Sequence, residues 1–445
     1  MPITRTIATI ALAGLLVACS DDTERPDPDG SVGDGPTITE GGPPPDKKLV
    51  FLTPHSVDSK KAGVYATAAA CGGKIGVAYY RNVGKVNVLC QGAGVPPKPT
   101  NKMRPAQDIH YVEFDGNSWS TPVKVDRTIG PPFGISIAFD KACKTVHIGY
   151  TGGDVNRQEC SASNAMVASS SDGKTFTTAA KATAGDGDTV GHWTSVGVDS
   201  SGAVHVAHRD VQYGYYTQDG NKKADLVYDS TKVTTGDAEN RGAGLYARLI
   251  FDSKGDPMVL HYNGTEISSH GGLQLITSTG GSLDAKGKQL VQGSVGELPD
   301  IATDGKGRFG VVYYSPKEQA LQYMESSDLK TWSESKVDLA LTRNGEYSSL
   351  AFDGYGNPGI AYYRCSEYGK SSCQASKDAL MFAYRNKGVW KTYEVDTGDS
   401  QYCGTYAALA FTKDNEPVIA YKCVVFDNLK NDWVDTLKTV IGVYQ

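Results

Sequence analysis

The chain of 445 residues carries 44 basic and 50 acidic side chains, a formal net charge of −6, and 39% hydrophobic residues. This length and hydrophobic content are sufficient for a large folded domain. The chain has a small acidic excess and no basic stripe, which argues against a nucleic-acid-binding protein.

The first 18 residues have the pattern of an export signal. A single basic residue, Arg5, precedes an apolar run over residues 7–17, which is too short to span a bilayer. The run ends in Leu16-Val17-Ala18-Cys19, which resembles the bacterial lipobox. The resemblance implies that Cys19 is diacylated and that Ser20 directs the chain to the outer membrane. We therefore expect an exported outer-membrane lipoprotein on the periplasmic or cell-surface side; an ordinary secretory signal is the alternative.

Residues 19–46 are rich in Asp, Pro and Gly and lack the apolar residues for a core. We expect a disordered tether between the lipidated cysteine and a domain of residues 47–445. The eight acidic residues and Arg25 of this segment, together with Arg5, leave 42 acidic and 42 basic residues in the domain. The domain is therefore neutral, and we expect membrane contact through the lipid anchor alone and no nucleic-acid partner.

Residues 48–58 form the first predicted strand, and seven copies of one pattern follow. Each copy has two apolar runs of strand length around a turn related to Asp-x-x-Gly, as from Tyr347 to Tyr363. Asp initiates such turns, and Gly accepts the positive φ at their end. The middle of the second run falls at Val77, Ile148, Val206, Val259, Val311, Ile360 and Ile419, at intervals of 49 to 71 residues. This interval is typical of a four-stranded propeller blade.

The second half of most copies adds two predicted strands joined by a hairpin. Two of the hairpin turns, Ser170-Ser-Asp-Gly-Lys-Thr-Phe176 and Ser326-Ser-Asp-Leu-Lys-Thr-Trp332, resemble the Asp-box of sialidase-like propellers. Both are one residue short between Asp and Gly, and the second lacks the Gly. In that family the box belongs to the fold and lies far from the active site, so the resemblance implies a sialidase-like propeller and no chemistry at these turns.

The last copy is incomplete, because residues 435–445 supply only its third strand. Residues 48–58 compare with the outer strand 390–396 of the sixth copy, and we expect them to complete the last blade. This closes the ring and removes exposed sheet edges. The prediction is an all-β, seven-bladed β-propeller of four-stranded blades; six blades, the sialidase number, is the alternative.

Eight cysteines remain after Cys19, and an even number in an exported chain favours disulfides. The predicted pairs are Cys71–Cys143, Cys90–Cys160, Cys365–Cys373 and Cys403–Cys423; for the first four cysteines, pairing in sequence order is the alternative. No Cys-x-x-Cys spacing predicts a metal site. Asp186-Gly-Asp188 lacks the closing Glu of a calcium loop, so no cofactor is expected beyond this incomplete calcium pattern.

In a propeller, the loops entering the innermost strand and leaving the second strand share one face, here called the channel face, and such loops often bind ligands. Six residues before each turn, a strand-start column reads Tyr65, Gly134, Trp193, Tyr246, Leu298, Tyr347 and Tyr406. Aromatic faces stack on sugars, and arginine forks hold carboxylates. The predicted ligand-binding residues are Tyr65, Arg81, Trp193, Arg209, Tyr246, Tyr347, Arg364 and Tyr406. The alternative is that the aromatic residues cap the core between blades.

Two patterns on this face point to sugar hydrolysis. Arg81, Arg209 and Arg364 resemble the three arginines that hold the substrate carboxylate in sialidases, although no Arg-Ile-Pro motif accompanies them. Glu297 and Glu346 occupy one column of adjacent copies, and a pair of carboxylates is what a glycosidase requires. Two solvated rim carboxylates are the alternative reading of this pair.

A third pattern points to a lyase. His192, His208 and His261, with Tyr246 and Arg209, resemble the residue set of propeller-type polysaccharide lyases, in which a base removes the proton beside a uronate carboxylate. Packed core histidines are the alternative. The catalytic candidates from all patterns are His192, His208, Glu297 and Glu346.

We expect the domain to bind a glycan or a protein partner on its channel face without catalysis. A glycan-active enzyme, either a sialidase-like glycoside hydrolase or a polysaccharide lyase, is the alternative, and it requires two titratable groups near one reacting atom. A structural or assembly lipoprotein is a third reading, and it predicts a blocked channel.

Overall fold

The chain divides into two compact units, Met1–Thr39 and Glu40–Gln445. A computed structural model describes residues 47–91, 99–153, 163–177, 180–181, 189–216, 222–228, 231–233, 243–264, 271–279, 282–283, 287–293, 298–338, 344–365, 378–397 and 401–445, all within the second unit. The predicted signal, Cys19 and the tether lie outside these ranges. No helix in them has the length and apolar character needed to cross a membrane.

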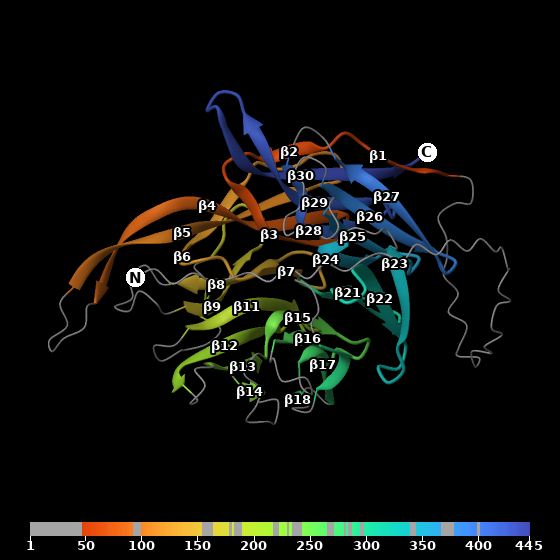
Figure 1. Cartoon of the computed structure of the whole chain (residues 1–445), viewed down its shortest axis with the longest axis horizontal. Coiled ribbons are helices and arrows are strands. Elements are labelled where there is room, and N and C mark those ends of the chain that lie inside the picture. Colours follow the sequence, from red (N-terminus) through yellow and green to blue (C-terminus); the bar gives the residue numbers. More distant parts are fainter. Residues whose placement is uncertain are drawn as a thin grey trace, which may run out of the picture. The chain divides into compact units, whose positions relative to one another are not determined.

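The described residues fold into β-strands, and most repeats form one antiparallel sheet each (Figure 1). The first repeat forms β3 (Ala62–Cys71), β4 (Lys74–Gln91), β5 (Pro99–Phe114) and β6 (Val123–Ile129). The fourth forms β15 (Leu245–Phe251), β16 (Pro257–Asn263), β17 (Gly272–Thr279), β18 (Ser282–Leu283) and β19 (Lys288–Gln292). The fifth forms β20 (Asp300–Thr303), β21 (Phe309–Ser315), β22 (Ala320–Ser326) and β23 (Ser333–Asp338). The sixth forms β24 (Asn344–Phe352), β25 (Pro358–Arg364), β26 (Ala379–Asn386) and β27 (Val389–Asp396).

The second and third repeats share one eight-stranded sheet. It contains β7 (Ile135–Phe139), β8 (Val146–Gly153), β9 (Ser163–Ser170), β10 (Ala180–Lys181), β11 (Thr189–Val198), β12 (Val204–Tyr216), β13 (Lys222–Tyr228) and β14 (Thr231–Val233). The two repeats join where β9 pairs with β11 in parallel, through Ser163 and Thr189. Among the described residues the hydrogen-bonded sheets therefore number six, as in the six-bladed alternative, and the expectation of seven separate sheets is not supported.

The last sheet contains both ends of the domain. It is built from β28 (Gln401–Phe411), β29 (Pro417–Asp427) and β30 (Asp432–Tyr444). The N-terminal strands β1 (Leu49–Phe51) and β2 (His55–Asp58) pair with β30 on its outer edge. The prediction that an N-terminal strand completes the last sheet is confirmed. Apolar side chains of the first and last sheets then pack into one core cluster, which closes the ring.

Buried tyrosines join neighbouring sheets. At the same position of the second strand, a Tyr hydroxyl donates to an Asp carboxylate on the outer strand of the preceding sheet. A buried hydroxyl needs such a partner, because an unsatisfied one costs stability. The pairs are Tyr79 with Asp58, Tyr150 with Asp126, Tyr362 with Asp338 and Tyr421 with Asp396. The pair with Asp58 also holds the closing strand β2 in place.

The turns between the first two strands follow the expected chemistry. Asp199, Asp252, Asp304 and Asp353 each accept backbone N–H groups two and four residues further on, at 2.8–3.0 Å. The two Asp-box turns likewise share one geometry, in which backbone N–H bonds lower the pKa of Asp172 and of Asp328 to about 2. Leu329 occupies the place of the expected Gly and has the left-handed φ, 59°, that a Gly would adopt there.

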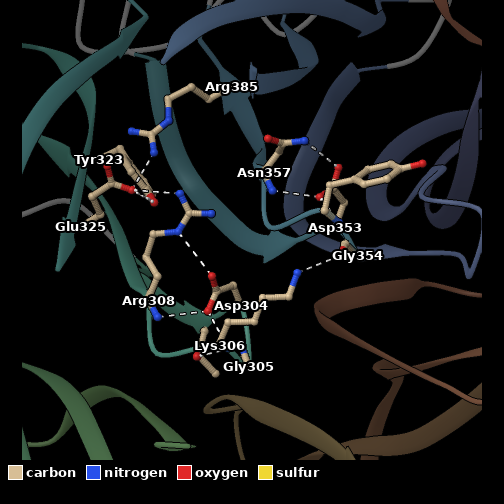
Figure 2. Close-up of polar contacts among 12 residues, drawn as sticks. Asp304, Gly305, Lys306, Arg308, Tyr323, Glu325, Asp353, Gly354, Asn357 and Arg385 are labelled. Carbon is tan, nitrogen blue, oxygen red and sulfur yellow. Dashed lines mark hydrogen bonds and ion pairs between the residues drawn. The ribbon is translucent and has the colours of Figure 1, made fainter. Parts of the chain in front are cut away.

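A buried charged network links the fifth and sixth repeats near these turns (Figure 2). Glu325 accepts a hydrogen bond from Arg385 at 2.6 Å and lies 3.7 Å from the guanidinium of Arg308. Arg308 also forms an ion pair with Asp304 at 3.5 Å, and both arginines are buried. One carboxylate thus bridges two buried cations from different sheets, which makes Glu325 central to the packing of this interface.

The structure contains two of the predicted disulfides, Cys71–Cys143 between the first two repeats and Cys403–Cys423 within the last. Cys365 is also disulfide-bonded. Its predicted partner Cys373, the side chain of Cys90, and Cys160 lie outside the described residues. Asp396 lies close to the Cys403–Cys423 pair. These sulfur atoms are already bonded to each other, and Asp396 accepts from Tyr421 and Lys438, so this group is not arranged as a metal centre.

Candidate ligand-binding site at the propeller axis

The strand-start column has an unusual backbone conformation. All seven of its residues have positive φ, between 51° and 71°. Gly adopts this region readily, but aromatic and branched side chains rarely do. In the repeats of Tyr65, Trp193, Tyr246, Tyr347 and Tyr406 the ladder between the first and second strands is irregular at this point. Such irregularities re-aim side chains.

The re-aimed side chains meet at the axis. The ring centroids of Trp193 and Tyr246 are 4.5 Å apart, and Tyr406 lies 4.7 Å from both Tyr65 and Tyr347. Tyr65 and Trp193 make an edge contact at 5.4 Å. Trp193 is buried with 9% of its surface exposed, whereas the four tyrosines are half-buried. We call these five residues, together with the buried Leu298, the aromatic plug.

The plug nearly fills the axis where it lies. The cavity lined by Tyr65, Trp193, Leu298 and Tyr406 has a volume of only about 20 Å³. Gly134, the one column member without a side chain, is required here, because a Cβ atom would lie 2.9 Å from the indole of Trp193. The structure therefore brings the predicted aromatic residues into one cluster, in which they pack on each other and also keep partly exposed surface.

The three predicted arginines each have a separate partner. Arg81 forms a partly buried ion pair with Asp58 of the closing strand β2. The Nε of Arg209 donates to the carbonyl of Ala243 at 3.1 Å, and Arg364 pairs with Glu394. These contacts hold the three guanidinium groups at different sheets. The arginine that lines the axis is Arg248, which the sequence analysis did not identify.

The candidate histidines lie in the core. His208 and His261 are fully buried, at the position where the other five repeats carry the tyrosines of the second strand. His261 accepts the N–H of Gly244 at 3.1 Å, and burial lowers its pKa to about 4. His192 is buried and stacks on Phe133 with a centroid distance of 4.0 Å. Of the candidate carboxylates, Glu346 is half-buried beside Tyr347, and Glu297 lies outside the described residues.

A second, polar cavity lies along the same axis, with a volume of about 210 Å³; we call it the axial cavity. Its polar lining comes from the positions two residues after the strand-start column. All seven positions line this cavity. In chain order they are Thr67, Ser136, Ser195, Arg248, Asp300, Ser349 and Ala408.

Most of these side chains connect one repeat to the next. Each accepts the backbone N–H three residues after the strand-start position of the following repeat, at 2.7–3.1 Å. The pairs are Ser136 with Val196, Ser195 with Leu249, Asp300 with Leu350 and Ser349 with Leu409. The second oxygen of Asp300 accepts the N–H of Ile301 and lies 3.3 Å from Nε of Arg248. Burial raises the pKa of Asp300, while Arg248 and the backbone N–H groups oppose this shift.

Comparisons with known proteins agree with a propeller and leave the family open. No family of known proteins matches the sequence, and no curated protein does. A lectin from Burkholderia pseudomallei aligns over 88% of this chain and 98% of its own, with 11% identity and a TM-score of 0.51. Trypanosoma rangeli sialidase in complex with sialic acid aligns over 89% of this chain and 59% of its own, at 10% identity and a TM-score of 0.46. A Hadza microbial sialidase covers 88% and 96%, at 11% identity and a TM-score of 0.43. The likeness to the lectin establishes that this chain shares its fold, and the chain is an all-β β-propeller.

Proposed function

We propose that this protein is a non-catalytic, glycan-binding propeller whose ligand rests on the four half-exposed tyrosines of the aromatic plug. The observation that carries the proposal is their contact in one continuous cluster at the axis. Aromatic faces stack on the apolar faces of sugar rings. Lys422, whose Nζ lies 5.7 Å over the ring of Tyr406, and the half-buried Glu346 supply polar groups beside this floor.

Binding is favoured over catalysis because the three candidate histidines are buried in the fold. His208 and His261 belong to a buried structural column. The hydroxyl of Tyr80 donates to the backbone carbonyl of Gly134 at 3.0 Å, and burial raises its pKa, so among the described residues this tyrosine has no adjacent base that could activate it as a nucleophile. A sialidase-like hydrolase or a polysaccharide lyase remains the second candidate function, with Glu346 as the described carboxylate beside the plug.

A glycan array probed with the full chain tests the proposal. On a glycan hit, Tyr347→Ala should weaken binding about two- to tenfold, since one aromatic contact contributes about 0.5–1.5 kcal/mol. Tyr347→Phe retains the ring and should bind like the parent. Trp433→Ala removes an exposed aromatic side chain of β30 outside the plug and serves as the matched control. Equal binding by all three variants, or no binding to any glycan, would refute the role of the plug.

Turnover assays on the same hits separate the two functions. Reducing-sugar release or unsaturated-uronate formation that disappears in Glu346→Gln would replace the binding function by an enzymatic one. We expect neither product to accumulate above the level seen without protein.

We also propose export as a lipoprotein through Cys19. Metabolic labelling with a fatty acid should mark the parent chain and leave Cys19→Ser unlabelled. An unlabelled parent chain would contradict the anchor and leave ligand binding unaffected.

We infer further that the eight-stranded sheet comprises two blades, which gives seven in the ring. The parallel link between β9 and β11 is a single residue pair, whereas the strands within each half pair antiparallel over several residues. Ala165, Val196 and Val206 of the two halves also form a core cluster of their own, as at other blade interfaces. An experimental structure with strands β7 to β14 in one continuous, unbroken blade would overturn this count.

A further inference from the structure

Two positions of the polar column, Arg248 and Ala408, have no side-chain acceptor for the N–H of the next repeat, and of these two only Arg248 brings a charged group to the axial cavity. In the second, third and sixth repeats the position holds Ser, whose hydroxyl accepts the backbone N–H of the next repeat. The fourth repeat has Arg248 instead. A guanidinium has no acceptor, so the N–H of Ile301 in the fifth repeat is bonded by Asp300 of its own strand. Unlike Ala408, Arg248 adds a guanidinium to the lining of the cavity, and the role of this group calls for an explanation.

The surroundings of Arg248 leave most of its donors available. Among the described residues, Arg248 forms an ion pair with Asp300, whose Oδ1 lies 3.3 Å from Nε. Asp300 is itself engaged by the N–H groups of Ile301 and Leu350. The guanidinium carries five N–H donors, and the side chain keeps 25% of its surface exposed although it lines the cavity. The outer nitrogens therefore face cavity space and not a protein acceptor among the described residues.

Hydroxyl groups complete the donor set. Ser195 accepts the N–H of Leu249 through its oxygen, which leaves its proton available to a ligand. Thr67 lines the same cavity from the first repeat. The volume of about 210 Å³ is many times the roughly 10–15 Å³ of probe-occupied space that one water needs, so a polyatomic ligand fits.

We propose that the axial cavity is a binding site for a small inorganic oxyanion, phosphate or sulfate, held by the guanidinium fork of Arg248 and by the hydroxyls of Ser195 and Thr67. Arginine forks match the geometry of such anions. The negative charge of Asp300 is turned toward backbone N–H groups, which reduces its repulsion of a bound anion. A plain Arg–Asp ion pair does not explain the size of the cavity that the guanidinium lines.

The variant that tests the site is the double substitution Arg248→Ser/Asp300→Ser. It gives the fourth and fifth repeats the serine found in the second, third and sixth, so it is expected to fold, and it removes both charges together. Calorimetric titration of the full chain with phosphate, sulfate and acetate, at constant ionic strength, measures binding directly. We expect saturable binding of phosphate or sulfate by the parent chain and at least a tenfold loss in the double variant.

Thermal unfolding gives a second readout. The unfolding midpoint of the parent chain should rise with phosphate or sulfate and saturate, and the rise should disappear in the double variant. If the double variant does not fold, Arg248→Lys keeps the charge without the fork and should weaken binding at least several-fold. Equal anion dependence in parent and variant would mean an adventitious ion only and would overturn the proposal. Binding of acetate alone would overturn it as well. The glycan site is tested separately by Tyr347→Ala, so failure of the anion proposal would not decide the proposed function.

Discussion

Within a strand, Ala is ordinarily more stable than Gly. In the strand-start column, where the backbone is left-handed, we predict the opposite order. Leu298 has φ of 56° and is buried with 6% exposure, and no ligand-binding role is proposed for it. Replacement by Ala or by Gly removes the same packing, about 2–5 kcal/mol. A left-handed conformation costs an L-residue roughly 1–2 kcal/mol that Gly avoids. The greater freedom of Gly in the unfolded chain costs roughly 0.5–1 kcal/mol. The free energy of unfolding of the Gly variant should therefore exceed that of the Ala variant by about 0.5–1 kcal/mol.

Leu350 provides the matched control. It lies in β24, is buried to a similar degree, and its φ is not positive. There the Ala variant should be the more stable one by about 0.5–1 kcal/mol. Urea unfolding of the four variants at one pH measures both differences. If Gly and Ala differ with the same sign at both positions, the column is not held in the left-handed region, and the account of how the plug is formed is wrong.

Three further predictions concern the ring. Glu325→Gln leaves two buried arginines without their shared carboxylate and should lower the free energy of unfolding by about 3–5 kcal/mol. As a control, Glu318→Gln breaks the exposed ion pair with Lys336 and should lower it by less than about 1 kcal/mol. Equal losses for the two variants in urea unfolding would contradict the network. His261 binds a proton near pH 6.5 when unfolded but only near pH 4 when folded, so stability should fall as the pH is lowered between these values, by about 3 kcal/mol in total. His261→Gln should flatten this part of the profile, and an unchanged profile would exclude His261 as its source. Removal of the Cys71–Cys143 bond by a double Ser variant, over a sequence separation of 72 residues, should cost about 4 kcal/mol by loop entropy; a loss below about 1 kcal/mol would mean that the first two repeats hold together without it.

The repeat could be predicted because its signals are local. A turn of the form Asp-x-x-Gly is written in adjacent residues, and the same residues form its hydrogen bonds in the structure, as in Asp353 with Tyr355 and Asn357. The closing strand could also be predicted from the sequence. A missing fourth strand at one end and a spare strand at the other have one simple solution in a ring.

Features that depend on two repeats at once were harder to predict from the sequence. The hydrogen-bonded link between β9 and β11 depends on one residue pair, and nothing in either segment indicates it. The left-handed column was also missed, since Tyr and Trp give no indication of positive φ. The polar column two residues later was present as an alignment of Ser136, Ser195 and Ser349, and comparison of aligned positions would have found it. Its exception, Arg248, acquires meaning only after the bonds made by its neighbours are known.

The strand-start column and the polar column lie two residues apart on one strand, so a single innermost strand contributes to two different surfaces along the axis. The plug presents tyrosine rings, which suit a ligand with apolar faces. The axial cavity presents a guanidinium and hydroxyls, which suit a compact anion. Arg248 lines both the small cavity at the plug and the axial cavity, whereas Tyr347 does not line the axial cavity. Substitution of Tyr347 should therefore change sugar binding without changing anion binding. A Tyr347 variant that alters both would show that the axis is one continuous site.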